Sequence, residues 1–293
     1  MKVVGFGDNI VDRFIDRKVM YPGGNCVNFA VLAKKLGAES AYLGVFGSDE
    51  LGEFVRSALI DNGVAIERCL TREGPNGVTE IQVRAGDRIF LGWNGGGVTI
   101  SDPFVLSPGD LEYLAAFDLV HSSVYSASVP QLPALRSTGA LVSFDYSSEP
   151  EHRSAGFLAR TAPFVDLALL SLGGMSEADA VAELRRVVAA GAPIALGTRG
   201  EQGALLAAGG EIYAEPAAPT DPARFIDTMA CGDAFLTAAV LSLLDGGWTR
   251  ARFPGPPAFR TALSAAAVAA ADQCYVEGAF GGGRAVGTPI RII

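Results

Sequence analysis

Short apolar runs alternate with helix-like patterns along most of the chain. The runs Val3–Phe6 and Ala41–Val45 are each followed by a segment with helical spacing of apolar residues, at 25–36 and 50–62. Further strand-like runs lie later in the chain: Leu119–Ser122, Leu141–Phe144, Asp166–Leu170 and Ile194–Leu196. This order predicts an α/β fold, with a central, mostly parallel sheet and helices on both of its faces.

Two of the predicted helices begin with clear capping residues. Ser107 is followed by Pro108 at the first helical position and by Asp110 in the first turn. Ser176 precedes a helix that has Glu177 in its first turn and ends at Gly191.

One region interrupts the alternation of strands and helices. Val78–Val83 has the strand period, residues 84–88 predict a turn, and Arg88–Trp93 predicts a second strand. Arg13–Met20 is a candidate further strand of the same small sheet. Such a hairpin either extends the main sheet at its edge or covers a binding site, and we favour a lid. We therefore predict one α/β domain over residues 1–293, with lid strands at 13–22 and 77–100 inserted in it.

Composition narrows the classes of function. The 23 Lys and Arg residues against 32 Asp and Glu residues give a net charge of −9. This balance argues against nonspecific nucleic-acid binding and against docking on anionic membranes. The longest apolar runs are too short to span a bilayer. The N-terminus has no signal-peptide pattern, so we expect a cytoplasmic protein. The four cysteines are too far apart for a zinc or redox motif, and we expect reduced thiols.

The first glycine motif, Gly5-Phe6-Gly7, follows a predicted strand. A dinucleotide fingerprint needs another glycine at position 10, which is Ile10, so we exclude that interpretation. Asp8 and Asp12 remain at the carboxyl end of the first strand, where carboxylates accept hydrogen bonds from sugar hydroxyls. The alternative is a turn-capping Asp8 and a solvated Asp12.

Two further glycine-containing segments have both a functional and a structural interpretation. Gly23 and Gly24 precede Asn28, whose amide both donates and accepts hydrogen bonds, as a polyol ligand requires. The alternative is an ordinary glycine turn before a helix. Thr198 and Gly200 follow a strand and either contact a nucleotide or form a tight turn.

The segment Asp227–Asp233 carries the strongest signal, because small residues there open the apolar helix 234–244. Backbone N–H groups of Ala230, Cys231 and Gly232 at a helix N-terminus predict an anion site. In phosphoryl transfer, a carboxylate placed like that of Asp233 takes the proton of the attacking hydroxyl. The alternative is that Asp233 only complements the helix dipole.

Together, these motifs resemble the ribokinase/pfkB family of carbohydrate kinases, from Gly7 to about Gly278. The resemblance implies a ribokinase-like sheet, with ATP and Mg²⁺ used to phosphorylate a primary hydroxyl of a small sugar. It also implies that the lid builds a homodimer in many members. It assigns Asp233 as the base and the residues before it as the anion hole. The implied sugar-binding residues are Asp8, Asp12, Gly23, Gly24, Asn28 and Arg88, and the implied nucleotide-binding residues are Thr198, Gly200 and Thr228.

Four segments resemble one branch of this family more closely: Gly7–Asp12, Asp87–Phe90, Phe117–His121 and Ser143–Ser147. That branch phosphorylates sugar–amine adducts at the 6-hydroxyl, which makes fructoselysine the expected substrate. An unpaired carboxylate at Asp8 would then neutralise the ammonium group of the ligand.

The sequence also departs from the family pattern. Ala230-Cys231-Gly232 stands where Gly-Ala-Gly is usual, although the backbone donors are unaffected by these changes. The magnesium-linked Asn-x-x-Glu motif is absent: Ser171 stands at the position of the Asn, and Glu177 is the nearest acid, acting through water if at all. A monovalent cation remains an open possibility.

Three alternative functions remain open. A nucleoside kinase of the same fold would need an aromatic lid pocket, for which Phe90 and Trp93 are available. A catalytically idle sugar-binding protein is supported only by the missing Asn-x-x-Glu motif. Another ketose or ribose kinase of the same fold also remains open. Measuring ATP turnover against a panel of sugars distinguishes these functions.

Overall fold

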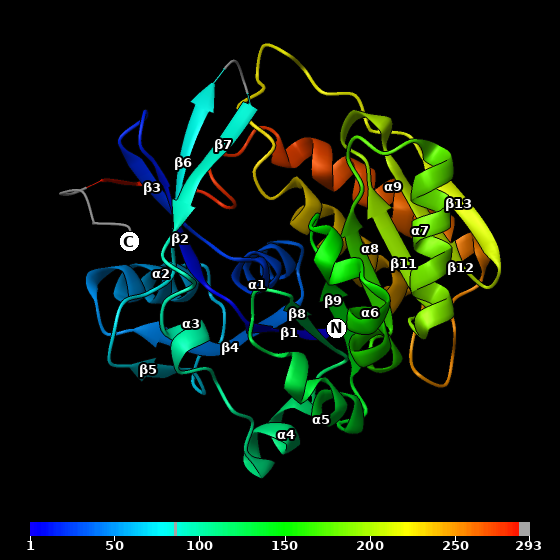
Figure 1. The fold of residues 1–293 in the computed structure, drawn as a ribbon, viewed down its shortest axis with the longest axis horizontal. Helices are drawn as coiled ribbons and strands as arrows, with labels where there is room; N and C mark the ends of the chain where they lie inside the picture. Colours follow the sequence, from blue (N-terminus) through cyan, green and yellow to red (C-terminus); the bar gives the residue numbers. More distant parts are fainter. Residues whose placement is uncertain (85–86, 287–293) are drawn as a thin grey trace.

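A nine-stranded sheet crosses the molecule in the computed structural model, which describes residues 1–84 and 87–286 and leaves out the side chains of 83–89 (Figure 1). Its strands, in spatial order, are β13 (Glu211–Glu215), β12 (Ala204–Ala208), β11 (Ile194–Thr198), β10 (Leu167–Ser171), β9 (Leu141–Asp145), β8 (Leu119–Ser123), β1 (Lys2–Gly7), β4 (Glu39–Gly47) and β5 (Leu70–Arg72). The strands from β5 to β11 pair in parallel, and only β12 and β13 pair antiparallel. The predicted mostly parallel sheet is confirmed.

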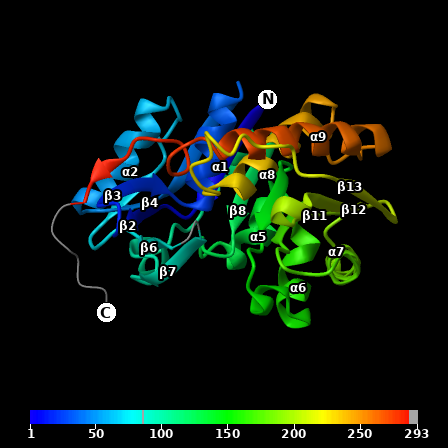
Figure 2. The same ribbon diagram turned by 90° about the horizontal axis from the view of Figure 1, so that it is seen from above.

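Helices cover both faces of this sheet, as predicted. They are α1 (Asn25–Lys35), α2 (Glu50–Asp61), α3 (Val98–Ser101), α4 (Pro108–Leu114), α5 (Leu132–Ser137), α6 (Ala155–Thr161), α7 (Glu177–Ala190), α8 (Cys231–Asp245) and α9 (Pro256–Gln273). Figure 2 shows α1, α2, α8 and α9 on one face and α5, α6 and α7 on the other. Alternate residues of β1 enter different cores: Val3 packs with α8 and α9, whereas Val4 and Phe6 pack on the opposite face. Strands buried on both faces explain the continuous apolar runs in the sequence.

The predicted helix starts are formed by the expected caps. The Ser107 side chain accepts a hydrogen bond from the Asp110 backbone, and the Asp110 carboxylate accepts one from the Ser107 backbone. Ser176 caps α7, and Gly191 ends that helix with a φ of 127°, which a glycine adopts without strain.

A second, five-stranded sheet stands beside the main one. Its order is β14 (Arg284–Ala285), β3 (Val19–Gly23), β2 (Ile10–Phe14), β6 (Val78–Arg84) and β7 (Asp87–Trp93). Figure 1 shows the predicted β6–β7 hairpin projecting from the molecule, and residues 85–86 of its turn lie outside the described residues.

The expectation of a single strand over Arg13–Met20 is wrong. The chain turns back within this segment, so β2 ends at Phe14 and β3 begins at Val19, and the two pair antiparallel. The residues between them are mostly polar, and Lys18 has a φ of 51°, which belongs to a tight turn and not to a strand.

The turn between β2 and β3 connects the small sheet to the segment that precedes α8. The Arg17 guanidinium lies 3.3 Å from the carboxylate of Asp227. The Asp227 carboxylate also accepts a hydrogen bond of 2.8 Å from the backbone of Met229. This contact places the small sheet next to the predicted anion site.

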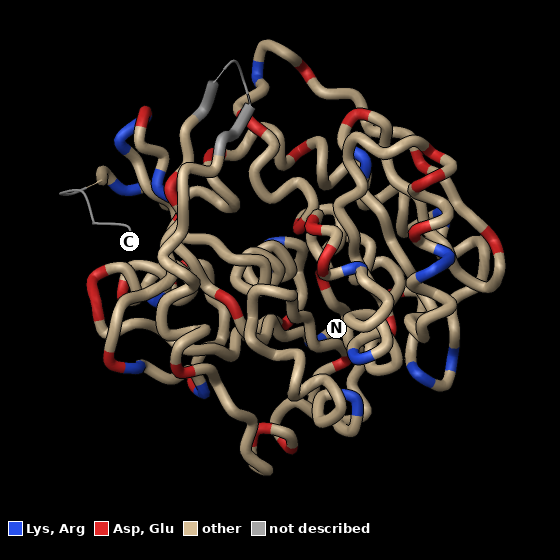
Figure 3. Tube along the Cα trace, in the orientation of Figure 1, with Lys and Arg blue, Asp and Glu red and all other residues tan. Residues whose placement is uncertain are grey.

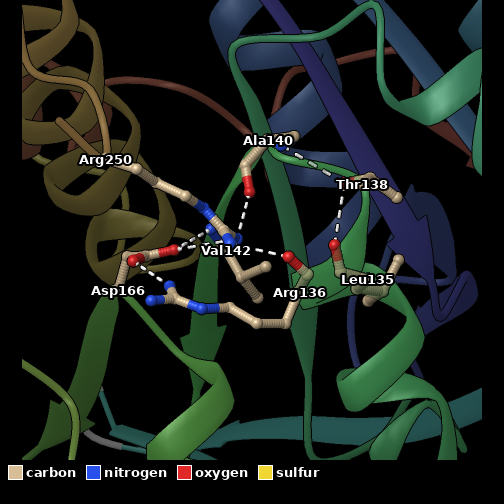
Figure 4. Close-up of polar contacts among 7 residues, drawn as sticks. All are labelled: Leu135, Arg136, Thr138, Ala140, Val142, Asp166 and Arg250. Carbon is tan, nitrogen blue, oxygen red and sulfur yellow. Dashed lines mark hydrogen bonds and ion pairs between the residues drawn. The ribbon is translucent and has the colours of Figure 1, made fainter.

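A carboxylate and two arginines form ion pairs at the amino ends of the parallel strands, at the residue before β10. Asp166 accepts a hydrogen bond from the Val142 backbone and pairs with Arg136 and Arg250 (Figure 4). Arg250 also donates to backbone carbonyls of Arg136 and Ala140. Elsewhere, Lys and Arg are scattered among Asp and Glu along the described trace (Figure 3). Within the described residues, no helix is both long and apolar enough to cross a membrane.

Candidate active site

Polar side chains gather at the carboxyl edge of the main sheet, where α/β proteins bind ligands. Asp8 follows β1, Ser123 ends β8 and Asp145 ends β9. The N-terminus of α1 lies against the same edge, since Asn25 donates to Asp145 over 2.7 Å and Asn28 donates to Asp233 over 2.8 Å. Segments far apart in sequence are thus brought into one site.

Asp8 is held by the protein itself. One carboxylate oxygen accepts hydrogen bonds from Ser123 Oγ at 2.8 Å and Ser126 Oγ at 2.7 Å. The other accepts from the backbone N–H of Asn25 at 2.6 Å. Both oxygens of Asp8 therefore already accept hydrogen bonds from neutral donors, which the sequence did not predict, and its role toward a ligand ammonium stays a prediction. Its hydrogen bonds fix the start of α1 against the loop that follows β8.

Glycines keep open the space beside Asp12 and Asn28. A Cβ at Gly23 would lie 2.6 Å from Asp12 Oδ2 and 3.8 Å from Asn28 Oδ1. Gly24 has a φ of 107°, and a Cβ there would lie 2.8 Å from the Cα of Asn9. Any larger residue at either position would fill the site or strain the backbone.

Asn28 faces this space with an oxygen that has no partner. Its side chain is 5% exposed, and its Oδ1 has no hydrogen-bond partner among the described atoms. Its amide nitrogen is already used by Asp233. Because an unpaired buried acceptor costs free energy, this oxygen is suited to receive a donor from a ligand.

The anion site lies at the start of α8. Ala230 adopts the left-handed conformation, with a φ of 57°, at the N-cap. Glycine adopts this conformation without strain, which accounts for the glycine usual in the family. Gly232 has no atom within 4 Å of where a Cβ would be, so its backbone borders open space. The first N–H groups of a helix have no partner within the helix and can bind an anion.

Asp233 stands in this first turn with its carboxylate buried. Burial, together with the nearby charge of Asp145, raises the pKa of Asp233 to about 8, although the Asn28 hydrogen bond opposes the shift. Burial also raises the pKa of Asp145 to about 7, with Asp8 and Glu149 contributing. A carboxyl group that titrates near neutral pH is suited to take up a proton during a reaction.

A pair of thiols adjoins the anion site. Cys231 Sγ lies 3.5 Å from Cys274 Sγ, which is too far for a disulfide bond, and both thiols are free. Gln273, next to Cys274, donates to the backbone carbonyls of Met229 and Ala279. These contacts anchor the end of α9 against the loop that carries the anion site.

The predicted nucleotide residues lie at the same edge of the sheet. Thr198 ends β11, and Gly200 follows with a φ of 59° and open space around it. Thr228 precedes the anion site and accepts a hydrogen bond of 3.3 Å from the Cys231 N–H at its backbone carbonyl. Arg88 belongs to β7, and its side chain lies outside the described residues.

The two residues linked to magnesium in the sequence lie at the surface. Glu177 is exposed at the start of α7, and its carboxylate lies 3.6 Å from the Arg199 guanidinium. Ser171 is also exposed, at the end of β10. The described residues contain no group of three or more His, Cys, Asp or Glu side chains that could hold a metal ion. A role of Glu177 toward magnesium through water stays a prediction, because magnesium usually keeps several waters and takes only one or two carboxylates from the protein.

Sequence reasoning gave no role to Asp145, Tyr125 or Glu149. Tyr125 donates to Glu149 over 2.6 Å, and Glu149 follows Asp145 in the turn after β9. One signal was available, because Asp145 directly follows a predicted buried strand, as Asp8 does. Their convergence requires the parallel pairing of β1, β8 and β9, which no local pattern specifies.

Comparisons with known proteins identify the family of this chain. The model of the pfkB family carbohydrate kinases matches residues 14–141. Fructosamine kinase FrlD of Bacillus subtilis is 35% identical over 97% of this chain and 94% of its own length. Fructoselysine 6-kinase of Shigella flexneri is 30% identical over 78% of this chain and 84% of its own length.

Solved structures share the fold. Aminoimidazole riboside kinase from Salmonella enterica superposes with a TM-score of 0.74 at 23% identity, covering 99% of this chain and 97% of that one. Arabidopsis thaliana ribokinase, complexed with ribose and ATP, gives a TM-score of 0.74 at 20% identity, covering 94% and 93%.

The ribokinase-like fold and the relatives together define a carbohydrate kinase, a phosphotransferase with an alcohol group as acceptor. More specifically, the chain belongs to the pfkB family of carbohydrate kinases.

Proposed function

We propose that this kinase transfers the γ-phosphoryl group of ATP to the 6-hydroxyl of a ketose that carries an amine-linked substituent, with fructoselysine as the best candidate. The sequence relatives named for fructosamine and fructoselysine support this substrate class. The observation that carries the proposal is the set of buried carboxylates, Asp145 and Asp233 among them, at the carboxyl edge of the sheet. Carboxylates in a low-dielectric site favour a ligand that is itself cationic.

In this proposal the residues at the start of α8 perform the transfer. Asp233 accepts the proton of the 6-hydroxyl as that oxygen attacks phosphorus. The N–H groups of residues 230–232 stabilise the charge on the phosphoryl group in flight. Asn28 and Asp12 hold the sugar hydroxyls, and Asn28 also fixes the Asp233 carboxylate through its 2.8 Å hydrogen bond.

The nucleotide lies, in this proposal, along Thr198, Gly200 and Thr228. Magnesium enters bound to the phosphates of ATP, and a water-mediated role of Glu177 stays a prediction. The small sheet closes over the acceptor and excludes water, so that ATP is not hydrolysed. Dimerisation through the small sheet, activation by a monovalent cation and a cytoplasmic location stay predictions.

A thermal-shift screen tests the substrate class directly. Sugars, fructosamines and nucleosides are each added with and without ADP, because a ligand that binds the folded state raises the melting temperature. Fructoselysine is expected to give the largest shift. A larger shift with adenosine would favour a nucleoside kinase. Binding of sugars without any ATP turnover would favour an idle sugar-binding protein.

A further inference from the structure

A turn next to the candidate active site carries carboxylates that the proposed chemistry does not use. It follows β9 and runs from Asp145 to Glu149. Ser147 in its centre has a φ of 59°, a left-handed conformation that costs a serine about 1 kcal/mol. Such strained residues are concentrated at functional sites, where the surrounding structure holds them in place.

Ser147 links the two carboxylates of this turn. Its backbone N–H donates to Asp145 Oδ1 over 2.7 Å. Its hydroxyl lies 2.8 Å from the hydroxyl of Tyr125, which in turn donates to Glu149 over 2.6 Å. Asp145 is thus fixed at the floor of the site, and Glu149 is fixed closer to the surface.

The lid hairpin reaches the same place. The Trp93 ring, at the end of β7, lies 6.5 Å from the ring of Tyr125 in an edge-to-face arrangement. Trp93 is 46% exposed, which leaves much of its indole uncovered. His152 lies on the other side of Tyr125, and its Nδ1 is 3.6 Å from Glu149, an ion pair only when the imidazole is protonated.

The acceptors in this region outnumber the donors. Asp145 and Asp233 form no ion pair with a described Lys or Arg side chain, and each receives only neutral hydrogen-bond donors. Asn28 adds a buried oxygen with no described partner, beside Asp233. A ligand that fits this set must bring N–H and O–H donors and a positive charge.

We propose that Asp145, Glu149, Tyr125 and Trp93 form the subsite for the amine-linked substituent of the acceptor. This inference rests on the proposed function. With the 6-hydroxyl at Asp233, the ammonium that joins sugar and substituent lies at Asp145. The methylene chain of the substituent lies along the uncovered surface of the Trp93 indole, beside Tyr125, and a second cation at its end pairs with Glu149. The ligand class is therefore a fructosamine made from a diamine-type amino acid such as lysine.

Three acceptor substrates distinguish the contributions of the two positive charges. Fructose has neither cation, an alkylamine adduct of fructose has only the linking ammonium, and fructoselysine also has an ammonium, next to a carboxylate, at the far end. The wild-type kcat/KM is expected to rise in that order. Because each value is compared as a ratio within one variant, an effect on the base Asp233 cancels.

The variants then test each carboxylate. Glu149→Gln is expected to lower the ratio of fructoselysine to alkylamine adduct about tenfold, the scale of one charge-assisted hydrogen bond. Asp145→Asn is expected to lower kcat/KM for both adducts, relative to kcat/KM for fructose, by about tenfold or more. Glu151→Gln removes an exposed carboxylate nearby and is expected to leave all ratios at wild-type values.

The possible results distinguish a failure of the subsite from a failure of the proposed function. If the wild type prefers both adducts and neither variant changes the ratios, the subsite is wrong and the proposed function stands. If the wild type does not prefer adducts at all, both fail. Should Glu149→Gln not fold, Tyr125→Phe removes the hydroxyl that orients Glu149. An unchanged fructoselysine ratio in that variant would also overturn the subsite.

Discussion

At the scale of single residues, the surroundings of Asp233 oppose the ionisation of its carboxyl group. It is 9% exposed, it accepts a hydrogen bond from Asn28, and a second buried carboxylate raises its pKa. A purely structural carboxylate at a helix N-terminus would gain from remaining ionised, because the dipole favours negative charge. Burial that opposes ionisation is instead characteristic of a residue kept for chemistry.

Replacing this carboxylate isolates its role as a base. Asp233→Asn is expected to lower turnover roughly 10²–10⁴-fold, the range for general base catalysis. ATP affinity should stay near wild type, because the N–H donors of the anion site are backbone groups. Steady-state kinetics and nucleotide titration measure the two effects. Turnover close to wild type would remove Asp233 from the reaction.

The same residue predicts a pH dependence of stability. The pKa of Asp233 is raised from 3.8 to about 8, so between these values the folded chain keeps a proton that the unfolded chain releases. Stability therefore falls as pH rises through this window. Asp233→Asn lacks this loss, so its advantage in melting temperature over wild type should grow from about pH 5 to about pH 8. An advantage that is constant with pH would mean that the Asp233 carboxyl titrates normally.

At the scale of elements, the N-terminus of α8 is one of the parts that depart from the family pattern. Ala230 and Cys231 replace small residues, yet an anion site depends on N–H groups and free space rather than on side chains. Cys231→Ala is therefore expected to keep turnover near wild type. Gly232→Val places a side chain in the open space and should lower turnover about 10²-fold, the scale of losing one transition-state donor. Equal effects of the two substitutions, measured as kcat, would contradict this account.

The elements show what local patterns predict well. The capped helices α4 and α7 begin where Ser107 and Ser176 indicated, because capping involves residues only a few positions apart. The segment Arg13–Met20 was predicted poorly, since a tight turn at non-glycine residues leaves little trace in the pattern. The short edge strand β5 escaped notice because its sequence, Leu-Thr-Arg, has no apolar run.

The candidate site shows the same difference between features set by local sequence and features set by distant contacts. Asp12, Asn28 and Asp233 were predicted from glycine-containing segments that are visible in the sequence. The structure places these side chains near one another, and their roles stay predictions. The hydrogen bonds of Asp8 were not predicted, because its partners Ser123 and Ser126 are more than a hundred positions away in sequence. Contacts of this kind are set by sheet order and are not encoded in spacing along the chain.

At the scale of the whole molecule, two sheets meet around one acidic region. The main sheet supplies the carboxyl edge, and the small sheet reaches it through Arg17, which pairs with Asp227, and through Trp93, which contacts Tyr125. The net charge of −9 adds a general attraction for cationic ligands, although the local carboxylates dominate within the site. Substrate preference is therefore a property of the assembled molecule.

The most direct test of the account compares kcat/KM for fructoselysine, fructose, ribose and adenosine under identical conditions. The account predicts that fructoselysine is the best acceptor, because only this ligand brings positive charge to the buried carboxylates. A preference of about tenfold corresponds to roughly 1.4 kcal/mol of discrimination between transition states. If ribose or adenosine exceeds fructoselysine by that factor, the assignment to amine-linked ketoses is wrong, while the assignment to the carbohydrate kinases stands.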